Sequence, residues 1–429
     1  MLRSLASAVR RAPGRCALGV CVFVAITGYM AWDFLVLREP WQLLVDLDVY
    51  RDAGVSVLIG RPIYHHFTAT PQLLPFTYPP IAALFAIPLA LLPLRVLGWL
   101  WTAMQFALLA GIVGYAFRPF LTRFGRWQPV ALGALAGGLM WIEPLRDGVM
   151  FGQVNVILIA LVLADYVAKA PRWPRGMLIG IATAVKLTPG VFILHLWFSG
   201  RRREAITAAA TATGCTLLAF LVVPVDSADF WFRALLDSER LGPNAGTSNQ
   251  SIRGMLMRLH VDNGLLWLAL CALIGFLAYR YAVRCSRIGH ELGACAIVGL
   301  LAVLLSPVAW IHHLAWIVPG LGVIVGDGRN LRRLLLMVGT AVYFILPIPW
   351  WGAELALPGH PLPEFVARVI EDAFGLAAIA LIPLIARYAL HDTRDSRRAP
   401  GAELGQPARP AKAARGRTAE AVLREATPA

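Results

Sequence analysis

The 429-residue chain contains few charged residues, since only 15% are Asp, Glu, Lys or Arg whereas 58% are hydrophobic. A soluble protein of this length carries roughly a quarter charged residues. The composition therefore excludes a soluble globular fold. Long apolar runs indicate instead an integral membrane protein, whose core is buried in lipid or inside a helix bundle.

Lysine is nearly absent and occurs only at positions 169, 186 and 412, so the net charge of +14 comes almost entirely from arginine. Arginines near the ends of apolar runs are typical of the cytoplasmic side of membrane proteins. A soluble basic face with interleaved aromatic residues is missing from the sequence. We therefore expect no nucleic-acid partner.

The sequence also lacks the common signatures of metal, disulfide and nucleotide sites. No CxxC or Cys/His metal spacing occurs, and Rossmann and P-loop fingerprints are absent. We expect neither disulfides nor zinc, no cofactor and no bound metal, although two acids close in sequence, Asp46 and Asp48, leave a metal open. The six cysteines lie mostly inside apolar runs, at positions 16, 21, 215, 271, 285 and 295.

The apolar runs predict an all-α polytopic membrane domain over residues 1–390 with about twelve crossings. The first run, 16–36, follows a basic start and is interpreted as an uncleaved signal anchor with its N-terminus inside. Residues 391–429 are rich in Pro, Ala and Arg and predict a disordered basic cytoplasmic tail. The further runs are 79–94, 96–117, 129–144, 152–168, 176–198, 205–225, 264–282, 291–309, 313–326, 334–351 and 369–389.

Arginine clusters orient the predicted spans. Clusters at 201–203, 280–287 and 329–333 are expected to be cytoplasmic, which places segments 37–78, 226–263 and 306–313 on the outer face. Two loops, 118–128 and 169–175, each hold three basic residues but fall outside on a strict count. A re-entrant run at 176–198, with another break near 79–94, would bring both loops inside, and the sequence leaves this open.

The first outer segment contains a cluster of acidic residues. Asp46 and Tyr50 are four residues apart and share one face of a predicted short interfacial helix over 46–60. Asp48 and Asp52 share another face, where pairing with arginines such as Arg61 is the plain structural interpretation. Asp46 lies at the membrane junction, where a partly desolvated carboxylate has a raised pKa and suits a general base.

Several polar residues border predicted spans. Tyr78, in segment 75–80, marks either a helix start or an aromatic surface for a sugar ring. Gln153 and Asn155 follow a charge-balanced turn at 143–148, and either helix–helix hydrogen bonds or ligand binding explain them. Lys186 in mid-membrane indicates a charged partner or an anionic ligand, unless its side chain reaches the nearer interface.

The outer segment 247–254 holds three side chains that suit a polar ligand, Asn249, Gln250 and Arg253. Such a loop can hold hydroxyl groups and a phosphate. A plain helix cap explains the same residues equally well from their spacing.

The outer segment 305–316 contains adjacent histidines, His312 and His313, flanked by Trp310 and Trp316. Neighbouring residues on a helix point about 100° apart, so we do not expect both histidines to bind one metal. Either a structural role or a site for a phosphate and a sugar remains open.

Six short strings, taken in order over roughly residues 40–350, resemble the family 87 glycosyltransferases. The resemblance implies a GT-C-type membrane enzyme of actinobacteria, an α-(1→2)-mannosyltransferase that uses a polyprenyl-phosphate-mannose donor on the outer face of the plasma membrane. Family members mannosylate phosphatidylinositol mannosides, lipomannan or lipoarabinomannan, so the implied partners are this donor, a glycolipid acceptor and the lipid bilayer. The strings are Asp46-Leu47-Asp48-Val49-Tyr50, Phe76-Thr77-Tyr78-Pro79-Pro80, Gly152-Gln153-Val154-Asn155, Lys186-Leu187-Thr188-Pro189, Asn249-Gln250-Ser251, and Ser306-Pro307 with Trp310-Ile311-His312-His313 and Trp316.

The resemblance places the family's catalytic Asp on Asp46 and its histidine pair on His312 and His313. The donor of the family is β-linked, so an α product implies inversion by a single displacement with one base near the acceptor hydroxyl. Positive or hydrogen-bonding groups are expected to stabilise the leaving phosphate. The expected substrate-binding residues are Arg51, Tyr78, Gln153, Asn155, Lys186, Asn249, Gln250, Arg253, Trp310 and Trp316.

Two other classes of function compete with a transferase. A glycolipid transporter or flippase suits broken helices and an intramembrane lysine, but the sequence lacks internal repeats and its polar motifs gather on one face. A scaffold subunit of an envelope-synthesis complex would have an outer surface without a cavity.

Overall fold

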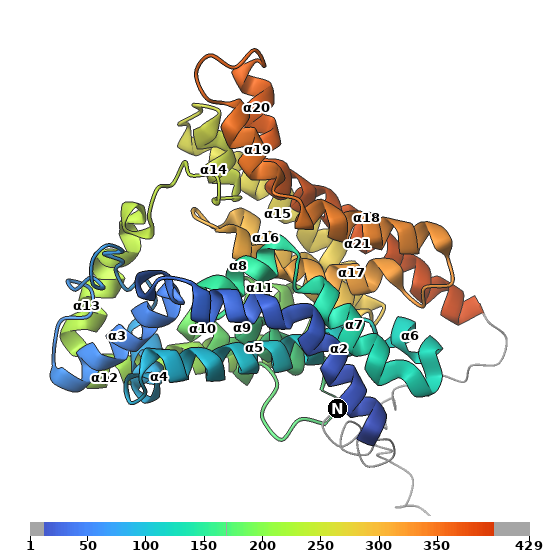
Figure 1. Cartoon of the computed structure of the whole chain (residues 1–429), viewed down its shortest axis with the longest axis horizontal. Helices are drawn as coiled ribbons and strands as arrows, with labels where there is room; N and C mark the ends of the chain where they lie inside the picture. The colour runs from blue at the N-terminus through green and yellow to red at the C-terminus, as the bar shows by residue number, and fades with distance from the viewer. Residues whose placement is uncertain (1–12, 169, 399–429) are drawn as a thin grey trace, which may run out of the picture.

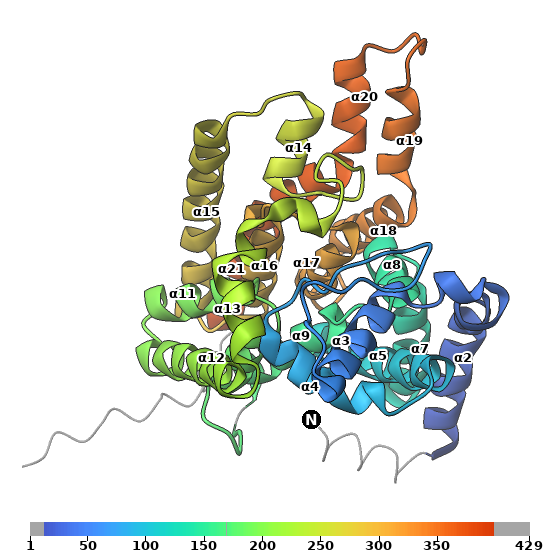
Figure 2. The ribbon, with the colours of Figure 1, turned by 90° about the vertical axis from the view of Figure 1, so that its left-hand side faces the viewer.

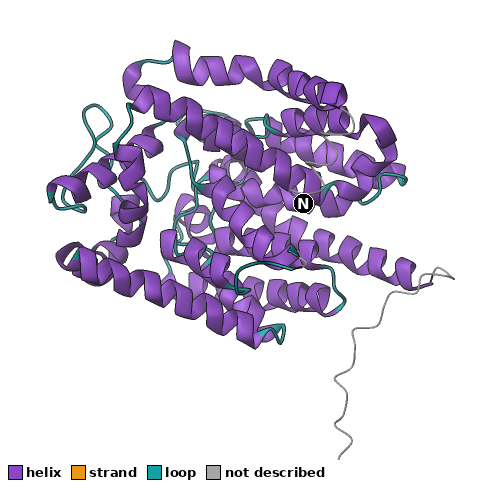
Figure 3. Cartoon of the chain, turned by 90° about the horizontal axis from the view of Figure 1, so that it is seen from below, coloured by secondary structure: helices purple, strands orange, loops and turns teal. Residues whose placement is uncertain are grey.

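Helices form the regular structure of this protein in a computed structural model that describes residues 13–168 and 170–398 (Figures 1 and 3). Those residues contain no strand, only two isolated bridges between extended segments. The helices of the first half are α2 (Pro13–Trp32), η1 (Asp33–Leu37), α3 (Val45–Ile59), α4 (Pro80–Ala90), α5 (Leu94–Ala116), α6 (Arg118–Leu121), α7 (Gln128–Leu139), α8 (Glu143–Phe151), α9 (Asn155–Val167), α10 (Met177–Val185), α11 (Gly190–Phe198) and α12 (Arg202–Val222). The second half contains α13 (Pro224–Phe232), α14 (Ile252–Arg258), α15 (Gly264–Arg287), α16 (Glu291–Leu305), η6 (Ile311–Trp316), α17 (Ile317–Val325), α18 (Leu331–Ile345), α19 (Ile348–Leu355), α20 (Glu364–Glu371) and α21 (Ala373–Arg398).

Several of these helices are long and apolar enough to cross a bilayer. Five qualify alone among the described residues, and seven if each of two bent pairs is counted as one span. The chain is therefore a multi-pass membrane protein. The expected count of about twelve crossings stays a prediction, because three further apolar helices, α4, α16 and the η6–α17 pair, are shorter than a full crossing.

Proline and glycine interrupt two of the apolar runs. The run 176–198 is divided into α10 and α11, with Lys186 in an extended conformation at the break. Pro189 cannot donate a backbone hydrogen bond and so favours this interruption. The helices α8 and α9 meet at a bend of 115° around Gly152. Both breaks place polar residues inside the bundle.

Close backbone contact joins the first helix to α7. A Cβ atom on Gly133 would lie 2.0 Å from the carbonyl oxygen of Gly19, and one on Gly19 would lie 2.4 Å from that of Pro129. Small residues allow membrane helices to approach in this way, where packing replaces the hydrophobic effect. The signal-anchor run is thereby part of the bundle.

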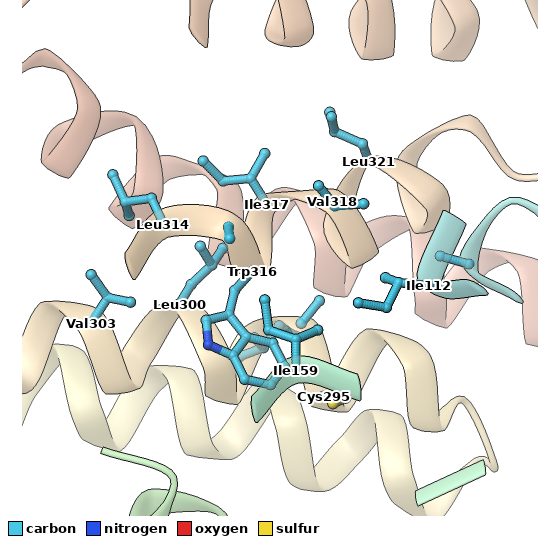
Figure 4. Packing of buried hydrophobic residues seen from close by; sticks show 14 of the residues in the cluster. Ile112, Ile159, Cys295, Leu300, Val303, Leu314, Trp316, Ile317, Val318 and Leu321 are labelled. Atoms are coloured by element: carbon cyan, nitrogen blue, oxygen red, sulfur yellow. The ribbon is translucent and has the colours of Figure 1, made fainter. Parts of the chain in front are cut away.

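The centre of the bundle is α16, which is buried along nearly its whole length. The indole of Trp316 lies across it, so close to Gly299 that a Cβ there would be 2.1 Å from the ring. Figure 4 shows this ring among Leu300, Ile159 and Cys295. A packed core on this side fixes the position of η6, which carries both histidines.

The elements after the first and third long spans lie together. Helix α3 packs along α4, and α13 contacts both α4 and α12 (Figure 2). A helix is thus found where the sequence predicts one at 46–60. The pairing expected for one of its acids is also confirmed, since Asp52 Oδ1 lies 2.7 Å from Arg61 Nη2.

The C-terminal helix is longer than its sequence suggests. Helix α21 continues to Arg398, past residue 391, where we expect a disordered tail to begin. Arg333 of α18 ties this helix to the end of α17. Its guanidinium contacts both carboxylate oxygens of Asp392 at 2.5 and 2.9 Å and donates to the carbonyl oxygen of Ile324 at 2.7 Å. The rest of the predicted tail, 399–429, lies outside the described residues.

Candidate active site

The carboxylate of Asp46 lies deep in the protein, in the first turn of α3. Gln153 Nε2 donates a hydrogen bond to its Oδ2 at 2.5 Å. Burial raises the pKa of Asp46 above its usual value of 3.8, against the opposing effects of His312, Gln153 and Lys186. Asp46 keeps part of its surface accessible, so it is a proton acceptor that a ligand can reach.

Two tyrosines orient the amide of Gln153. Tyr50 lies one turn after Asp46, and its hydroxyl is 2.9 Å from that of Tyr78. Both hydroxyls donate to Gln153 Oε1 at 3.3 Å. Burial raises the pKa of each tyrosine well above its usual value, so both stay protonated donors. The amide oxygen faces the hydroxyls, and its NH₂ group therefore faces Asp46.

The break between α10 and α11 brings a lysine to the same place. Lys186 Nζ lies 2.7 Å from His313 Nε2, 3.2 Å from Asn155 Oδ1 and 3.4 Å from the Tyr78 hydroxyl. Which nitrogen donates in the contact between Lys186 and His313 depends on the tautomer of the imidazole. The sequence motifs around residues 78, 155, 186 and 313 thus meet at one cation.

His312 is oriented by an acid that we did not place in the site from the sequence. Its Nδ1 lies 2.7 Å from Asp147 Oδ2, and both residues are buried. Its backbone carbonyl accepts from Asn155 Nδ2 at 3.1 Å. The other ring nitrogen, Nε2, is buried and has no hydrogen-bond partner within the described part of the chain. Asp147 and Asn155 thus hold the ring, and Nε2 is left as a buried polar atom without a partner.

The sequence did not place Asp147 in the site, because it belongs to the turn 143–148, which we interpreted as charge-balanced. In the structure Arg146 pairs with Glu143 at 2.7 Å, which leaves Asp147 for His312. The spacing of one basic and two acidic residues is the only available signal. It shows that one acid must find a partner elsewhere.

The bend between α8 and α9 sets the position of two amides. Gly152 has a φ of +72°, and a Cβ there would lie 2.7 Å from the Cβ of Leu47 in α3. Only glycine allows both this conformation and this approach. Gln153 and Asn155 follow directly and point to Asp46 and Lys186 respectively.

The Asp46 cluster consists of Asp46, Tyr50, Tyr78, Gln153, Asn155, Lys186, His312 and His313. Its members differ in solvent exposure. Asp46, Tyr78, Lys186 and His313 keep partial access, whereas the residues that hold them are buried. A narrow cavity of about 20 Å³ adjoins His313, between α9, α11, α16 and η6. Trp316 lines it and stacks near Phe192, with ring centroids 5.1 Å apart. This side is mainly apolar, so anion-binding and apolar surfaces lie next to each other.

The outer-loop candidates have structural partners instead. Asn249 Oδ1 accepts from the backbone N–H of Ala309 at 2.9 Å, and Asn249 forms an isolated bridge with Trp310. Gln250 Oε1 accepts from the N–H of Gly375 at 2.8 Å. Ser251 caps α14, as the helix-cap interpretation predicts. This segment holds the chain just before the histidine pair and does not line the cluster.

Two expected arginines also lie elsewhere. Arg51 Nε donates to the carbonyl oxygen of Leu92 at 2.9 Å. Arg253 lies over the ring of Trp267, 5.7 Å from its centroid. A buried arginine that the sequence did not single out, Arg258, contacts Asp372 at 2.6 Å behind the outer loop. None of the three places its charge at Asp46.

The cluster suits proton abstraction beside an anion site. Among the described residues, no group of three or more His, Cys, Asp and Glu side chains is arranged to hold a metal ion. The arrangement supplies one accessible carboxylate, one ammonium group and one unpartnered imidazole nitrogen. These groups can accept a proton from a hydroxyl and stabilise a phosphate within the same space.

The chain is similar to known glycosyltransferases in sequence, and one solved structure matches its fold in part. The profile of glycosyltransferase family 87 matches residues 76–307. The chain is 32% identical over 362 residues to the polyprenol-phosphate-mannose-dependent α-(1-2)-phosphatidylinositol mannoside mannosyltransferase of Mycobacterium tuberculosis (strain H37Rv), covering 80% of this chain and 83% of the relative. It is 34% identical over 343 residues to the corresponding phosphatidylinositol pentamannoside mannosyltransferase of strain CDC 1551, covering 76% and 77%. A structural match, at 15% identity and a TM-score of 0.43, is ArnT from Cupriavidus metallidurans bound to undecaprenyl phosphate, covering 87% of this chain and 75% of that one.

Proposed function

The chain belongs to glycosyltransferase family 87, and from this we propose that it transfers mannose from polyprenyl-phosphate-mannose to a phosphatidylinositol mannoside through an α-(1→2) linkage. Relatives that share a third of the sequence over three quarters of the chain are named for this donor and linkage. Lipomannan or lipoarabinomannan acceptors fall within the same proposal.

The observation that carries the proposal is the pairing of Asp46 with an adjacent cationic cluster. The carboxylate accepts from Gln153 at 2.5 Å, and Lys186 lies in the same network through Tyr78. A transferase that uses a phosphate leaving group needs a base for the acceptor and positive charge for the leaving group. Asp46 and Lys186 would supply both in the proposed site.

The proposed reaction is a single displacement. The acceptor hydroxyl oxygen attacks the anomeric carbon of mannose while Asp46 takes its proton. The bond between that carbon and the phosphate oxygen breaks, and polyprenyl phosphate leaves with the bonding electron pair. Lys186 and the His312 imidazole, protonated on both nitrogens and paired with Asp147, stabilise its charge. A β-linked donor thereby gives an α-linked product.

Membership of the family also supports the proposed location of the active site. Family membership implies a GT-C-type membrane enzyme that acts on the outer face of the plasma membrane. The arginines at 201–203 begin α12, and the basic start of the chain precedes α2. By the positive-inside rule, both helices then lead from the cytoplasm to the face that carries Asp46.

Reconstitution tests the proposal. The purified full chain is incorporated into liposomes with polyprenyl-phosphate-mannose and phosphatidylinositol mannosides of increasing length. We expect one added mannose per acceptor, and linkage analysis should show an α-(1→2) bond. Absence of transfer with every acceptor and this donor, from protein that is correctly folded, would refute it.

A further inference from the structure

A second cavity lies outside the Asp46 cluster, beside the segment that follows α12. Its volume is about 270 Å³, and it is partly open at the surface. Its lining residues are His65, Arg233, Ala234, Asp237 and Arg240. None of them takes part in the contacts of Asp46, so the cavity needs a separate explanation.

The cavity lies at the level of a membrane boundary. The long apolar helix α12 ends at Val222, and α13 begins two residues later at Pro224. Three apolar side chains in the segment from α13 to Leu236 are strongly exposed: Val225 at 80%, Phe232 at 76% and Leu236 at 77%. Apolar side chains directly after a span are typical of a segment that lies in the headgroup region of the bilayer. We therefore expect the cavity to lie within reach of lipid headgroups.

Two arginines and one carboxylate, that of Asp237, line the cavity. Arg233 Nη2 lies 2.5 Å from Asp229 Oδ1 and also contacts His65, so Asp229 balances this arginine. Asp237 Oδ1 accepts from the backbone N–H of Glu239 at 3.1 Å. Arg240 lines the cavity without an ion-pair partner among the described residues. An unpaired guanidinium that faces a cavity is suited to a phosphate.

Arg240 also connects the cavity to the active site. Its Nη2 donates to the carbonyl oxygen of Tyr64 at 2.8 Å, and the Tyr64 hydroxyl donates to the carbonyl oxygen of Tyr78 at 2.7 Å. Tyr64 is fully buried. The loop 61–78 thus forms a common wall, with the cavity on one side and the Asp46 cluster on the other.

We propose that Arg240, with His65 and Arg233 beside it, binds the phosphodiester of the glycolipid acceptor while α13 lies among the surrounding lipids. The inference rests on the proposed function, in which Lys186 and His312 hold the phosphate of the donor. The acceptor is then the second anionic lipid, and a phosphodiester held at Arg240 leaves its sugars to cross the rim of loop 61–78 toward Asp46.

Kinetics of Arg240→Gln in reconstituted full-length protein test the site. With a phosphatidylinositol mannoside, we expect the acceptor KM to rise about tenfold, the size expected for loss of one charge-assisted hydrogen bond. The donor KM should not change. A neutral alkyl mannoside acceptor should react equally well with both proteins, because it has no phosphate. Arg329→Gln, in an exposed cytoplasmic loop, is the matched control for loss of one arginine and should match wild type.

Three results would overturn the inference. They are an unchanged KM for the charged acceptor, an equal loss with the charged and neutral acceptors, and a rise in the donor KM. An equal loss of activity with the charged and the neutral acceptor would show that Arg240 only supports loop 61–78 through its hydrogen bond to Tyr64.

Lipid retention tests the site without the reaction. Native mass spectrometry of purified wild-type protein should show phosphatidylinositol retained in preference to phosphatidylcholine, and Arg240→Gln should lose this preference. Equal retention of both lipids by wild type would overturn the inference. The measurement keeps its meaning even if no mannosyl transfer is found, so failure of this site and failure of the proposed function are distinguishable.

Discussion

Replacement of Asp46 by Asn tests the chemistry of the site most directly. Asn has the same shape, and its amide oxygen can still accept from Gln153 Nε2, which lies 2.5 Å from the carboxylate. The change therefore removes the base and leaves the packing. General-base catalysis contributes about 10²- to 10⁴-fold, so kcat should fall by that factor, or about 3 to 5 kcal/mol of transition-state stabilisation.

Although kcat should fall, the stability of the Asp46→Asn variant should stay the same or increase. Burial raises the pKa of Asp46 in the folded protein above its usual value. The folded state then binds this proton more tightly than the unfolded chain does, so ionisation costs stability as the pH rises through the two pKa values. At neutral pH, Asp46→Asn should melt at the same temperature as wild type or higher.

Activity is measured as mannosyl transfer in liposomes. The melting temperature is measured on the purified protein in detergent before reconstitution. Asp52→Asn is the matched control, because Asp52 lies in the same helix but pairs with Arg61. We expect the control to retain activity within a few-fold. Turnover of Asp46→Asn within tenfold of wild type would refute its role as the base, and a clear drop in melting temperature would refute the stability argument.

Three further changes test the surroundings. Asp147→Asn removes the charge that holds His312, and kcat should fall about 10- to 100-fold, in line with a charged hydrogen bond of about 1.5 to 3 kcal/mol; unchanged kcat would exclude this orienting role. Lys186→Met should lower kcat/KM for the donor by more than tenfold while thermal melts show a folded protein, and equal kinetics would remove the lysine from the phosphate site. Arg258→Met breaks a buried pair with Asp372 and should cost about 3 to 5 kcal/mol of unfolding free energy, seen as a lower melting temperature, whereas an unchanged melt would show that the pair adds nothing.

Local patterns predicted parts of the site well. Asp46 and Tyr50 share a helical face because they are four residues apart, and both reach Gln153. The lysine at a break in an apolar run has polar neighbours, His313 and Asn155, and the charged partner or anionic ligand expected for it stays a prediction. In both cases the cost of placing polar groups in apolar surroundings made them conspicuous.

Tertiary geometry decided what local patterns left open. The side chains of Asn249 and Gln250 are polar enough for a ligand, but their bonds to Ala309 and Gly375 use them as supports. Asp147 looked neutralised within its own turn. Its pairing with His312 depends on the packing of α8 against η6, which no spacing in the sequence reports.

The span count shows a similar limit. Hydropathy marks where the chain is apolar, but it does not show whether a run crosses the bilayer or turns back. The run 176–198 is mostly apolar outside its break, yet it forms two helices of nine residues each. Polar backbone at such a break is tolerated because protein covers it, and this cover is a property of the folded bundle.

The hydrogen bonds around Gln153 also constrain how this site can diverge among descendants. One amide oxygen serves two tyrosine hydroxyls, and the amide nitrogen serves the carboxylate. Loss of any one partner leaves a buried group unsatisfied, so single changes are penalised and their effects are not additive. We therefore expect Tyr50, Tyr78 and Gln153 to respond to substitution as a unit. New acceptor preferences are more accessible through the loops at the rim of the site than through this group.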